Sequence, residues 1–401
     1  MKKHSAVPQP LHNSTARIAT LAFYHFMADL ICGILPGILP VVMAYFNLDI
    51  ALGVMIISCM TIGSNLMQIP ASMLDRMHRG PRMLYLGLCM ASAILFLDFF
   101  PRTTPFFVLC ILMVIVGAGI SIMHPLGLRG VQKISDLPAT VTTPAFMTGG
   151  FFGASVSPWI SALLVESFGM KGLLLLVFPI FFLLLLIHYT NVKLAKDLPA
   201  GAKSQNHEDA KELFVPWSFR NLFLIGMFLN LGTSLILYLI PSYLVELKFS
   251  LQFGGLSAMI FGLGSSSGSL MIGYLVRKRS CTPFILGGLL LGIPMTASYF
   301  MLASHSWSLI LLFVSGLLTS SLFPILVSLA KNAESKVALS TKMGLIVGGT
   351  WGIAGLALLP IGQFAKQYGL PKTMILSCIF YTLTLITAAV TLKRNRTSGK
   401  R

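Results

Sequence analysis

Charged residues are scarce in this chain of 401 residues. Asp, Glu, Lys and Arg together make up 10% of the sequence, only 12 residues are acidic, and 55% of all residues are apolar. Soluble domains carry about 25% charged residues, because their surfaces must stay hydrated. This scarcity excludes an ordinary soluble globular protein and predicts a chain that lies largely within a membrane.

The sequence also lacks the motifs of common enzymes and metalloproteins. Its six cysteines are scattered without a CxxC pair, and its 21 methionines form no cluster with His or Cys. It contains no Walker-type GxxxxGK[ST] motif and no Gly-rich phosphate loop. We therefore expect no enzyme activity, no metal site and no cofactor, and we expect that this chain does not itself use ATP.

Twelve apolar runs can be read along the chain, each close to the roughly 20 residues that a membrane-spanning helix needs. A backbone in lipid must satisfy its own hydrogen bonds, and no barrel-type alternation is present, so the predicted fold is all-α. Residues 1–17 are polar and lack the apolar core of a cleavable signal, so we expect the first span to remain. The runs lie near 18–43, 51–75, 83–100, 105–130, 138–164, 171–192, 218–245, 252–276, 283–302, 308–330, 337–364 and 371–392.

The first half of the chain repeats in the second half. Gly117 and Pro125 recur 199 residues later as Gly316 and Pro324, and the Gly149-Gly150-x-x-Gly153 cluster recurs with the same offset. A duplicated six-helix membrane unit, with its halves around a central cavity, leaves such a repeat. The predicted organisation is a cytoplasmic segment 1–17, a six-helix bundle 18–192, a cytoplasmic linker 193–217, a second six-helix bundle 218–392 and a basic tail 393–401.

The net charge of +17 follows the expected membrane topology. With the N-terminus inside, 24 of the 29 Lys and Arg residues fall in cytoplasmic segments. This asymmetry is the positive-inside pattern, and it predicts an inner-membrane protein with both termini in the cytoplasm. It indicates contact with anionic lipids rather than with nucleic acid. The outer loops hold only Arg102, Lys171, Lys248, Lys366 and Lys372.

The loop after the second run carries a family motif. Ala71-x-x-x-Asp75-Arg76-Met77-His78-Arg79-Gly80 resembles the G-x-x-x-D-R-x-G-R-R signature of the major facilitator superfamily, as do the twelve spans arranged as two sixes. The second half keeps Gly273 and a basic run but has Arg277 in place of the acid. Gly153-x-x-x-Ser157-Pro158-x-x-Ser161-Ala162 is similar to the G-x-x-x-G-P-x-x-G-G of proton-driven exporters. The resemblance implies two pseudo-symmetric six-helix bundles and transport by alternating access.

Two further motifs resemble the fosmidomycin-resistance branch of that superfamily. The first span contains His25-Phe26-Met27-Ala28-Asp29, where the branch carries H-x-x-N-D. The fourth contains His124-Pro125-Leu126-Gly127-Leu128-Arg129, where the branch carries H-P-E-x-x-R. The branch's Asn is Ala28 here and its Glu is Leu126, so Asp29 is the only acid placed deep inside a predicted span.

We interpret Asp29, His25 and His124 as candidates for proton coupling. Asp29 lies about 12 residues into the first span, roughly 16 Å deep, where an uncompensated charge costs at least a few kcal/mol. His25 shares its helix face, and the resemblance places the span of His124 beside the same cavity. A carboxylate and two imidazoles can exchange protons near neutral pH. The alternative is a hydrogen-bonded cluster that only holds two spans together.

The remaining candidates form a latch and a cavity lining. By the resemblance, Asp75 meets the positive N-terminal end of a neighbouring helix and, with Arg76 or Arg129, completes a gate. The alternatives are a solvated loop acid and basic residues that pair with lipid phosphate. The substrate-cavity candidates are uncharged polar or aromatic residues, namely Asn230, Tyr238, Gln68 and Trp351.

Together these observations predict a monomeric secondary transporter that moves a small organic molecule by alternating access, with proton-coupled efflux as the leading mode. Two alternatives stay open. The same fold could import a small metabolite as a symporter or uniporter, which growth tests against drug-tolerance tests would distinguish. It could also be a transport-inactive sensor or scaffold, which a substitution of Asp29 without any phenotype would favour.

Overall fold

The computed structural model of the chain describes residues 11–68, 82–134, 136–194, 217–276, 280–333, 335, 337 and 339–398. Within these ranges the structure is helical, with turns between helices and no strand. Eleven helical segments are long and apolar enough to cross a membrane, and the apolar helix Ile50–Leu66 is shorter. Each of these twelve segments overlaps one predicted run, so the all-α prediction is confirmed.

Six spans make up the N-terminal half. Local sequence sets several of their ends: the Asp49 carboxylate accepts a hydrogen bond from the Leu52 amide at 2.9 Å and caps a helix, and Gly169 turns the chain with a φ of +66° that favours glycine. The elements are α1 (Leu11–Phe46), α2 (Ile50–Leu66), α4 (Arg82–Ala91) continued by η2 (Ser92–Phe99), α5 (Phe106–Gln132), α6 (Ala139–Phe168), and η3 (Met170–Leu176) continued by α7 (Val177–Tyr189).

The C-terminal half has the same number of spans. One is broken by a 3-10 turn and another by a π-helical turn. The elements are α8 (Phe219–Glu246), α9 (Leu251–Val276), α10 (Thr282–Leu302), then η4 (Ser306–Ser308), α11 (Leu309–Leu318), η5 (Ser320–Leu322) and α12 (Phe323–Asn332) as one span, α13 (Leu339–Gly344), η6 (Leu345–Gly349) and α14 (Thr350–Tyr368) as the next, and α15 (Leu370–Ser398).

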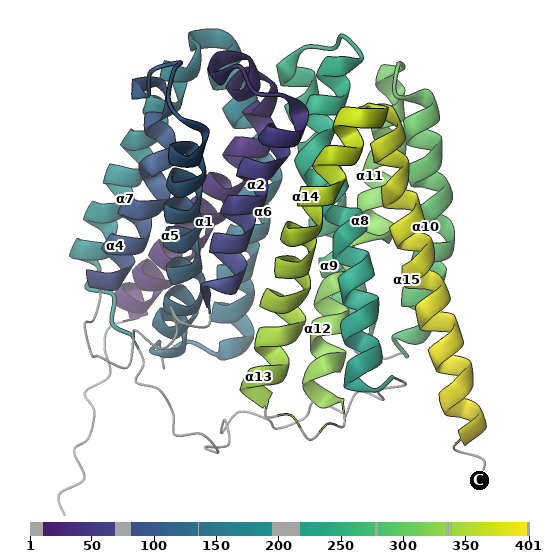
Figure 1. The fold of residues 1–401 in the computed structure, drawn as a ribbon. Helices are drawn as coiled ribbons and strands as arrows, with labels where there is room; N and C mark the ends of the chain where they lie inside the picture. The colour runs from purple at the N-terminus through teal and green to yellow at the C-terminus, as the bar shows by residue number, and fades with distance from the viewer. Residues whose placement is uncertain are drawn as a thin grey trace, which may run out of the picture.

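The two halves stand side by side, with α1 to α7 on the left of Figure 1 and α8 to α15 on the right. The first turn of α1 and the last turn of α15 lie at the same end of the bundle, which we call the terminal end; the opposite end is the distal end. Residues 1–10, 195–216 and 399–401, which contain most of the predicted linker and parts of the predicted terminal segments, lie outside the described residues.

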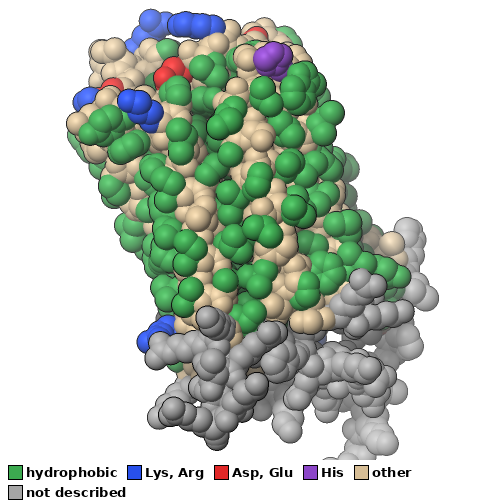
Figure 2. All heavy atoms as spheres, turned by 90° about the vertical axis from the view of Figure 1, so that its right-hand side faces the viewer, with side chains coloured by type: hydrophobic (Ala, Val, Ile, Leu, Met, Phe, Trp, Pro, Cys, Tyr) green, Lys and Arg blue, Asp and Glu red, His purple; other side chains and the backbone are tan. Residues whose placement is uncertain are grey.

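The outer flank of the C-terminal half is apolar. Figure 2 shows hydrophobic side chains covering the flank of the C-terminal half between its two ends, whereas charged side chains gather at the distal end and at the lower edge. Such a surface is what a protein presents to lipid tails. The chain is therefore a multi-pass membrane protein.

The sequence repeat corresponds to repeated packing. Gly117 of α5 lies so close to α2 that an added Cβ would overlap the Met60 carbonyl, and Gly316 of α11 lies equally close to the Phe261 carbonyl of α9. Small residues let membrane helices approach in this way. The two glycines that recur in the sequence thus perform the same task in each half.

The halves meet most extensively at two pairs of helices, α2 with α14 and α6 with α9, which we call the α2–α14 seam and the α6–α9 seam. On the first, the Ser58 hydroxyl donates to the Gly355 carbonyl at 2.6 Å. On the second, the Ser155 and Ser266 hydroxyls lie 3.2 Å apart. Figure 1 shows α2 and α14 meeting at the centre of the molecule.

Candidate functional site

The structure brings Asp29, His25 and His124 together inside the N-terminal half. His25 Nε2 lies 3.4 Å from Asp29 Oδ2, and His124 Nε2 lies 3.3 Å from Asp29 Oδ1. The imidazole rings are 5.1 Å apart and nearly perpendicular, at 84°. We call these three residues the His–Asp–His cluster. Their assembly from α1 and α5 was expected from the sequence, whereas their role stays a prediction.

Helix α1 extends further toward the terminal end than the sequence suggested. It begins at Leu11 and its apolar candidate span at Ser14, before the predicted boundary at 18, so Asp29 is about 22 Å along the helix from Ser14. The polar residues before position 18 continue the helix because they have partners at the terminal end. Ser14 Oγ, for example, donates to Asp136 Oδ2 at 2.8 Å.

His25 is held in one orientation by α6. Its Nδ1 lies 2.9 Å from the Phe146 carbonyl oxygen, and its ring stacks on the Phe146 ring at 4.2 Å. A carbonyl oxygen can only accept, so Nδ1 carries a hydrogen and donates. In the neutral ring Nε2 then bears a lone pair that faces the Asp29 carboxylate. The Nε2 lone pair and the carboxylate oxygen repel each other unless a cation, such as a proton, lies between them.

Gly150 leaves room beside the cluster. A Cβ added there would lie 2.5 Å from His25 Nε2 and 2.6 Å from Asp29 Oδ2, closer than side-chain carbons approach such atoms. The side chains of Asp29 and His124 are 20% and 27% exposed, whereas that of His25 is 7% exposed. The cluster is therefore reached from the side of Asp29 and His124, and His25 forms its buried wall.

One uncharged polar side chain of the C-terminal half lies near the cluster, and a second is buried on the same helix. Tyr238 of α8 is buried, lies beside Thr61 and is near enough to interact electrostatically with Asp29. Asn230 of α8 is also buried and donates to Thr350 Oγ1 at 2.8 Å, and its Oδ1 has no hydrogen-bond partner.

Asn230 occupies the position in the second half that Asp29 occupies in the first. Each lies eleven residues before a proline near the distal end of its helix, Pro40 in α1 and Pro241 in α8. The duplicated position therefore carries a carboxylate in one half and an amide in the other. The ionisable group belongs to the N-terminal half and a neutral hydrogen-bonding group to the C-terminal half.

The other predicted residues lie on other helices, at the end of α5 or outside the described part. Trp351 is half-buried and packs edge-on against Phe323, with ring centroids 5.9 Å apart. Gln68 and Arg129 are half-buried toward the terminal end, on the segment after α2 and in the last turn of α5. Asp75 and Arg76 lie outside the described residues, so the proposed latch stays a prediction.

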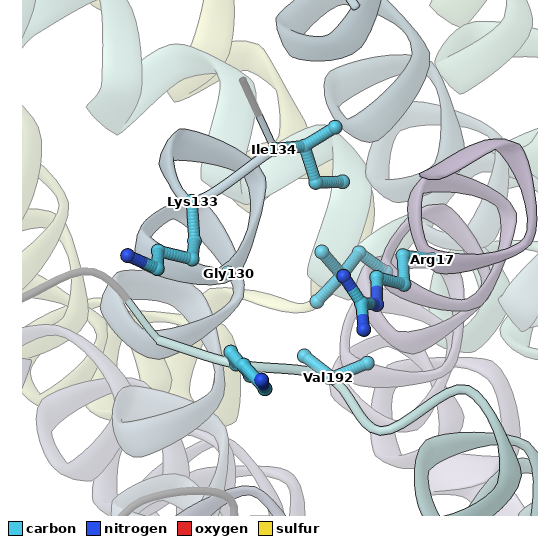
Figure 3. Close-up of a pocket in the computed structure, with 7 residues that line it drawn as sticks. Arg17, Gly130, Lys133, Ile134 and Val192 are labelled. Carbon is cyan, nitrogen blue, oxygen red and sulfur yellow. The ribbon is translucent and has the colours of Figure 1, made fainter. Parts of the chain in front are cut away.

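Two cavities lie apart from the cluster. A basic one at the terminal end, shown in Figure 3, is about 10 Å³ and too small for an organic solute; Arg17 and Lys133 belong to its lining. The other, at the distal end, is about 320 Å³, within the range of small-molecule sites. Both halves line it, with Pro40, Met43, Ala44 and Ile50 from one and Ser242, Val245, Glu246 and Leu370 from the other.

Two charged contacts close the distal ends of the halves against each other. Lys366 Nζ of α14 lies 2.8 Å from Asp49 Oδ2 before α2, across the α2–α14 seam. Glu166 Oε2 of α6 accepts from the Gln252 amide at 2.7 Å, in the first turn of α9, where a helix favours negative charge. The sequence analysis did not select these residues. In the sequence, Lys366 is visible only as a basic residue of an outer loop and Asp49 only as a residue that can cap a helix. Neither feature identifies the residue's partner.

The Asp49–Lys366 pair should make distal closure depend on pH. The pKa of the Asp49 carboxyl is lowered, chiefly by its hydrogen bond with Lys366 and next by the hydrogen bond from the Leu52 amide. Because this pKa is lowered in the closed protein, the pair stabilises distal closure above the ordinary pKa of a carboxyl, about 4. This stabilisation is lost as the pH falls through the lowered pKa of Asp49. Asp49→Asn removes it at every pH.

We expect Asp49→Asn to favour opening by no more than about 1 kcal/mol, or about fivefold, since the pair is partly exposed. A Val54→Cys reporter in an otherwise cysteine-free chain measures this, because Val54 is buried against Gly362 on the α2–α14 seam. Its labelling by a maleimide should quicken in Asp49→Asn and not in Lys372→Gln, which removes a distal charge outside the Asp49–Lys366 pair. Equal rates in all three proteins would contradict a closing role for the pair.

Comparison with known proteins gives the family. The profile of the Major Facilitator Superfamily matches residues 21–336. The chain belongs to this superfamily of membrane transporters. It is 21% identical over 382 residues to the fosmidomycin resistance protein of Escherichia coli (strain K12), covering 90% of this chain and 92% of that protein.

Solved transporters share the fold. A bacterial homologue of the human lysosomal transporter Spinster, in an inward-facing and occupied conformation, superimposes with a TM-score of 0.74 at 14% identity, covering 97% of this chain and 99% of that one. The nucleoside transporter NupG superimposes with a TM-score of 0.71 at 13% identity, covering 94% of this chain and 99% of that one. The D-xylose-proton symporter superimposes with a TM-score of 0.64 at 15% identity, covering 94% of this chain and 96% of that one. At such identities these likenesses concern the fold alone.

Proposed function

We propose that this protein is a proton-coupled secondary transporter that exports a small organic molecule across the inner membrane by alternating access. The observation that carries the proposal is the His–Asp–His cluster, deep in a membrane helix and reachable through Asp29 and His124. An ionisable group at such depth is costly, and in transporters it marks a proton or substrate path. The 21% identity with a fosmidomycin resistance protein supports efflux as the direction.

In this proposal Asp29 carries the transported proton, and His25 and His124 tune it. The titratable neighbours of Asp29 are these two histidines, Cys32 and Tyr238. The substrate is held between this group and the neutral wall of Asn230 and Tyr238. One side of this proposed substrate site thus binds protons and the other offers hydrogen bonds. This arrangement couples proton and substrate transport without a further cofactor.

The structure represents a state closed at the distal end. The two distal contacts join halves that must separate there before the cavity can open on that side. We assign the distal end to the outside, since it holds the few basic residues of the outer loops, and the terminal end to the cytoplasm. The protein works as a monomer in contact with anionic lipid, and its energy source is the proton gradient.

The test of transport uses the purified protein in liposomes with an imposed pH gradient. Uptake and release of a panel of labelled solutes, phosphonates among them, should show one class moving against its gradient and opposite to the protons. Movement with the protons would make the protein an importer. No proton-dependent movement of any solute, in liposomes where a known proton-coupled exporter works, would contradict the proposal.

We further expect the terminal end to face the cytoplasm. Reporter fusions after Arg401 and within the linker near Gly201 should both behave as cytoplasmic, because the basic residues of the flanking segments resist translocation. A fusion in the turn after Phe168, at the distal end, serves as the opposite control. One clear periplasmic signal from either of the first two fusions would overturn this topology.

A further inference from the structure

We propose that the His–Asp–His cluster is also a binding site for a divalent transition-metal ion of the Zn²⁺ class, with Nε2 of His25, Nε2 of His124 and the Asp29 carboxylate as ligands. The sequence analysis predicted no metal site, because the cysteines are scattered without a CxxC pair and the methionines form no cluster with His or Cys. The structure places their donor atoms within 4.8 Å of one another.

The distances suit a tetrahedral ion. Bonds of 2.0–2.1 Å from Zn²⁺ to imidazole nitrogen place neighbouring ligand atoms about 3.4 Å apart. The nitrogen–oxygen distances in the cluster are 3.4 Å from His25 Nε2 to Asp29 Oδ2 and 3.3 Å from His124 Nε2 to Asp29 Oδ1. Each imidazole thus faces its own carboxylate oxygen, and an ion between them requires the Asp29 carboxylate and the His124 ring, the more exposed of the two rings, to turn toward a common point.

The surroundings of His25 resemble those of a metal ligand. Metal-binding histidines almost always donate their second ring N–H to a carbonyl or carboxylate, which fixes the ring and directs the other nitrogen at the ion. The Phe146 carbonyl provides this contact to Nδ1 at 2.9 Å. In the neutral ring the lone pair of Nε2 then points at Asp29, and a metal ion can take the place of the proton between these two groups.

Space and access agree with this assignment. Gly150 keeps the region beside Nε2 and Oδ2 free of side-chain atoms. The partial exposure of Asp29 and His124 gives an ion a way in and leaves a fourth position for water or for an oxygen atom of a solute. Sites with three protein ligands commonly keep such an open position. Two imidazoles and one carboxylate favour Zn²⁺, Co²⁺ or Ni²⁺ over Ca²⁺ and Mg²⁺, which prefer all-oxygen sites.

Cobalt absorption tests this site directly. Tag-free protein in lipid nanodiscs is titrated with Co²⁺, whose visible bands report tetrahedral coordination, and then with Zn²⁺ as competitor. We expect one Co²⁺ per chain, displaced by Zn²⁺. Asp29→Asn and His124→Ala should weaken binding by at least about 100-fold, since even second-layer partners of a metal contribute about 10- to 100-fold. His188→Ala and His305→Ala, which change exposed histidines elsewhere, should bind as wild type does.

A variant that retains all three ligands completes the test. Gly150→Ala should also lose the Co²⁺ bands, because its methyl group fills the space beside Nε2 and Oδ2. Normal binding by Gly150→Ala, by His124→Ala or by Asp29→Asn, or no saturable binding by the wild type, would overturn the proposal. The metal site does not rest on the proposed transport: protein that transports but binds no Co²⁺ contradicts this inference alone, and protein that binds Co²⁺ without transporting contradicts the proposed function alone.

Discussion

Asp29→Asn is expected to reduce solute accumulation driven by a pH gradient to the level of protein-free liposomes. The substitution keeps the size of the side chain and its contacts with the two histidines but removes the group that gains and loses the proton. Substrate binding and passive exchange should persist, because the amide still offers hydrogen bonds and the wall formed by Asn230 and Tyr238 is unchanged. The measurements are accumulation under the gradient and exchange without it.

His124→Ala provides the graded comparison. His124 is the more exposed histidine of the cluster and contacts Asp29 through the other carboxylate oxygen, so its loss should shift the pH optimum rather than end transport. If Asp29→Asn accumulates solute at the wild-type rate, Asp29 is a packing residue and the coupling account is wrong. Loss of both accumulation and exchange would show instead that the substitution damages the fold.

Gly255→Leu is expected to hold the halves apart at the distal end and to stop transport. Gly255 of α9 lies on the α6–α9 seam so close to α6 that even a Cβ would overlap the Pro158 carbonyl. Overpacking of this kind typically costs about 1–3 kcal/mol. Because only the closed distal state contains the clash, the substitution should favour the open state by about 5- to 150-fold.

The Val54→Cys reporter and a control on the same helix test this expectation. In Gly255→Leu the reporter on the α2–α14 seam should be labelled much faster than in the parent protein. Gly273→Leu makes the same change in α9 where, among the described residues and apart from the helix's own backbone, no atom lies within 4 Å of the added Cβ, and it should behave as the parent. Equal labelling in both variants would mean that distal closure at Gly255 is not part of the transport cycle.

The architecture could be predicted from the sequence because the membrane restricts it so strongly. Lipid admits helices of one approximate length, and the repeat of Gly117 as Gly316 and of Pro125 as Pro324 indicated a duplicated unit. Residues four apart lie on the same face of a helix, so the shared face of His25 and Asp29 was also readable. The start of α1 was not, because its polar first turns find partners such as Asp136 that the sequence does not reveal.

The finer geometry of the site depends on contacts between distant segments. The Phe146 carbonyl that orients His25 is a backbone group, which any residue would supply, so no sequence signal marks it. The partnership of Asp49 with Lys366 joins the two halves and exists only because α2 and α14 meet. Gly150 was visible as part of a glycine cluster, but whether it serves packing or leaves room beside the His–Asp–His cluster depends on how α6 faces α1.

The central claim, that protons and solute are exchanged through the His–Asp–His cluster, is tested most directly by running the transporter in reverse. Liposomes containing the protein and a trapped pH dye are given a gradient of the transported solute and no initial pH difference. We predict that the wild-type protein moves protons against the flow of solute, whereas Asp29→Asn exchanges solute without a change in internal pH. Proton movement by Asp29→Asn at the wild-type rate would contradict the account.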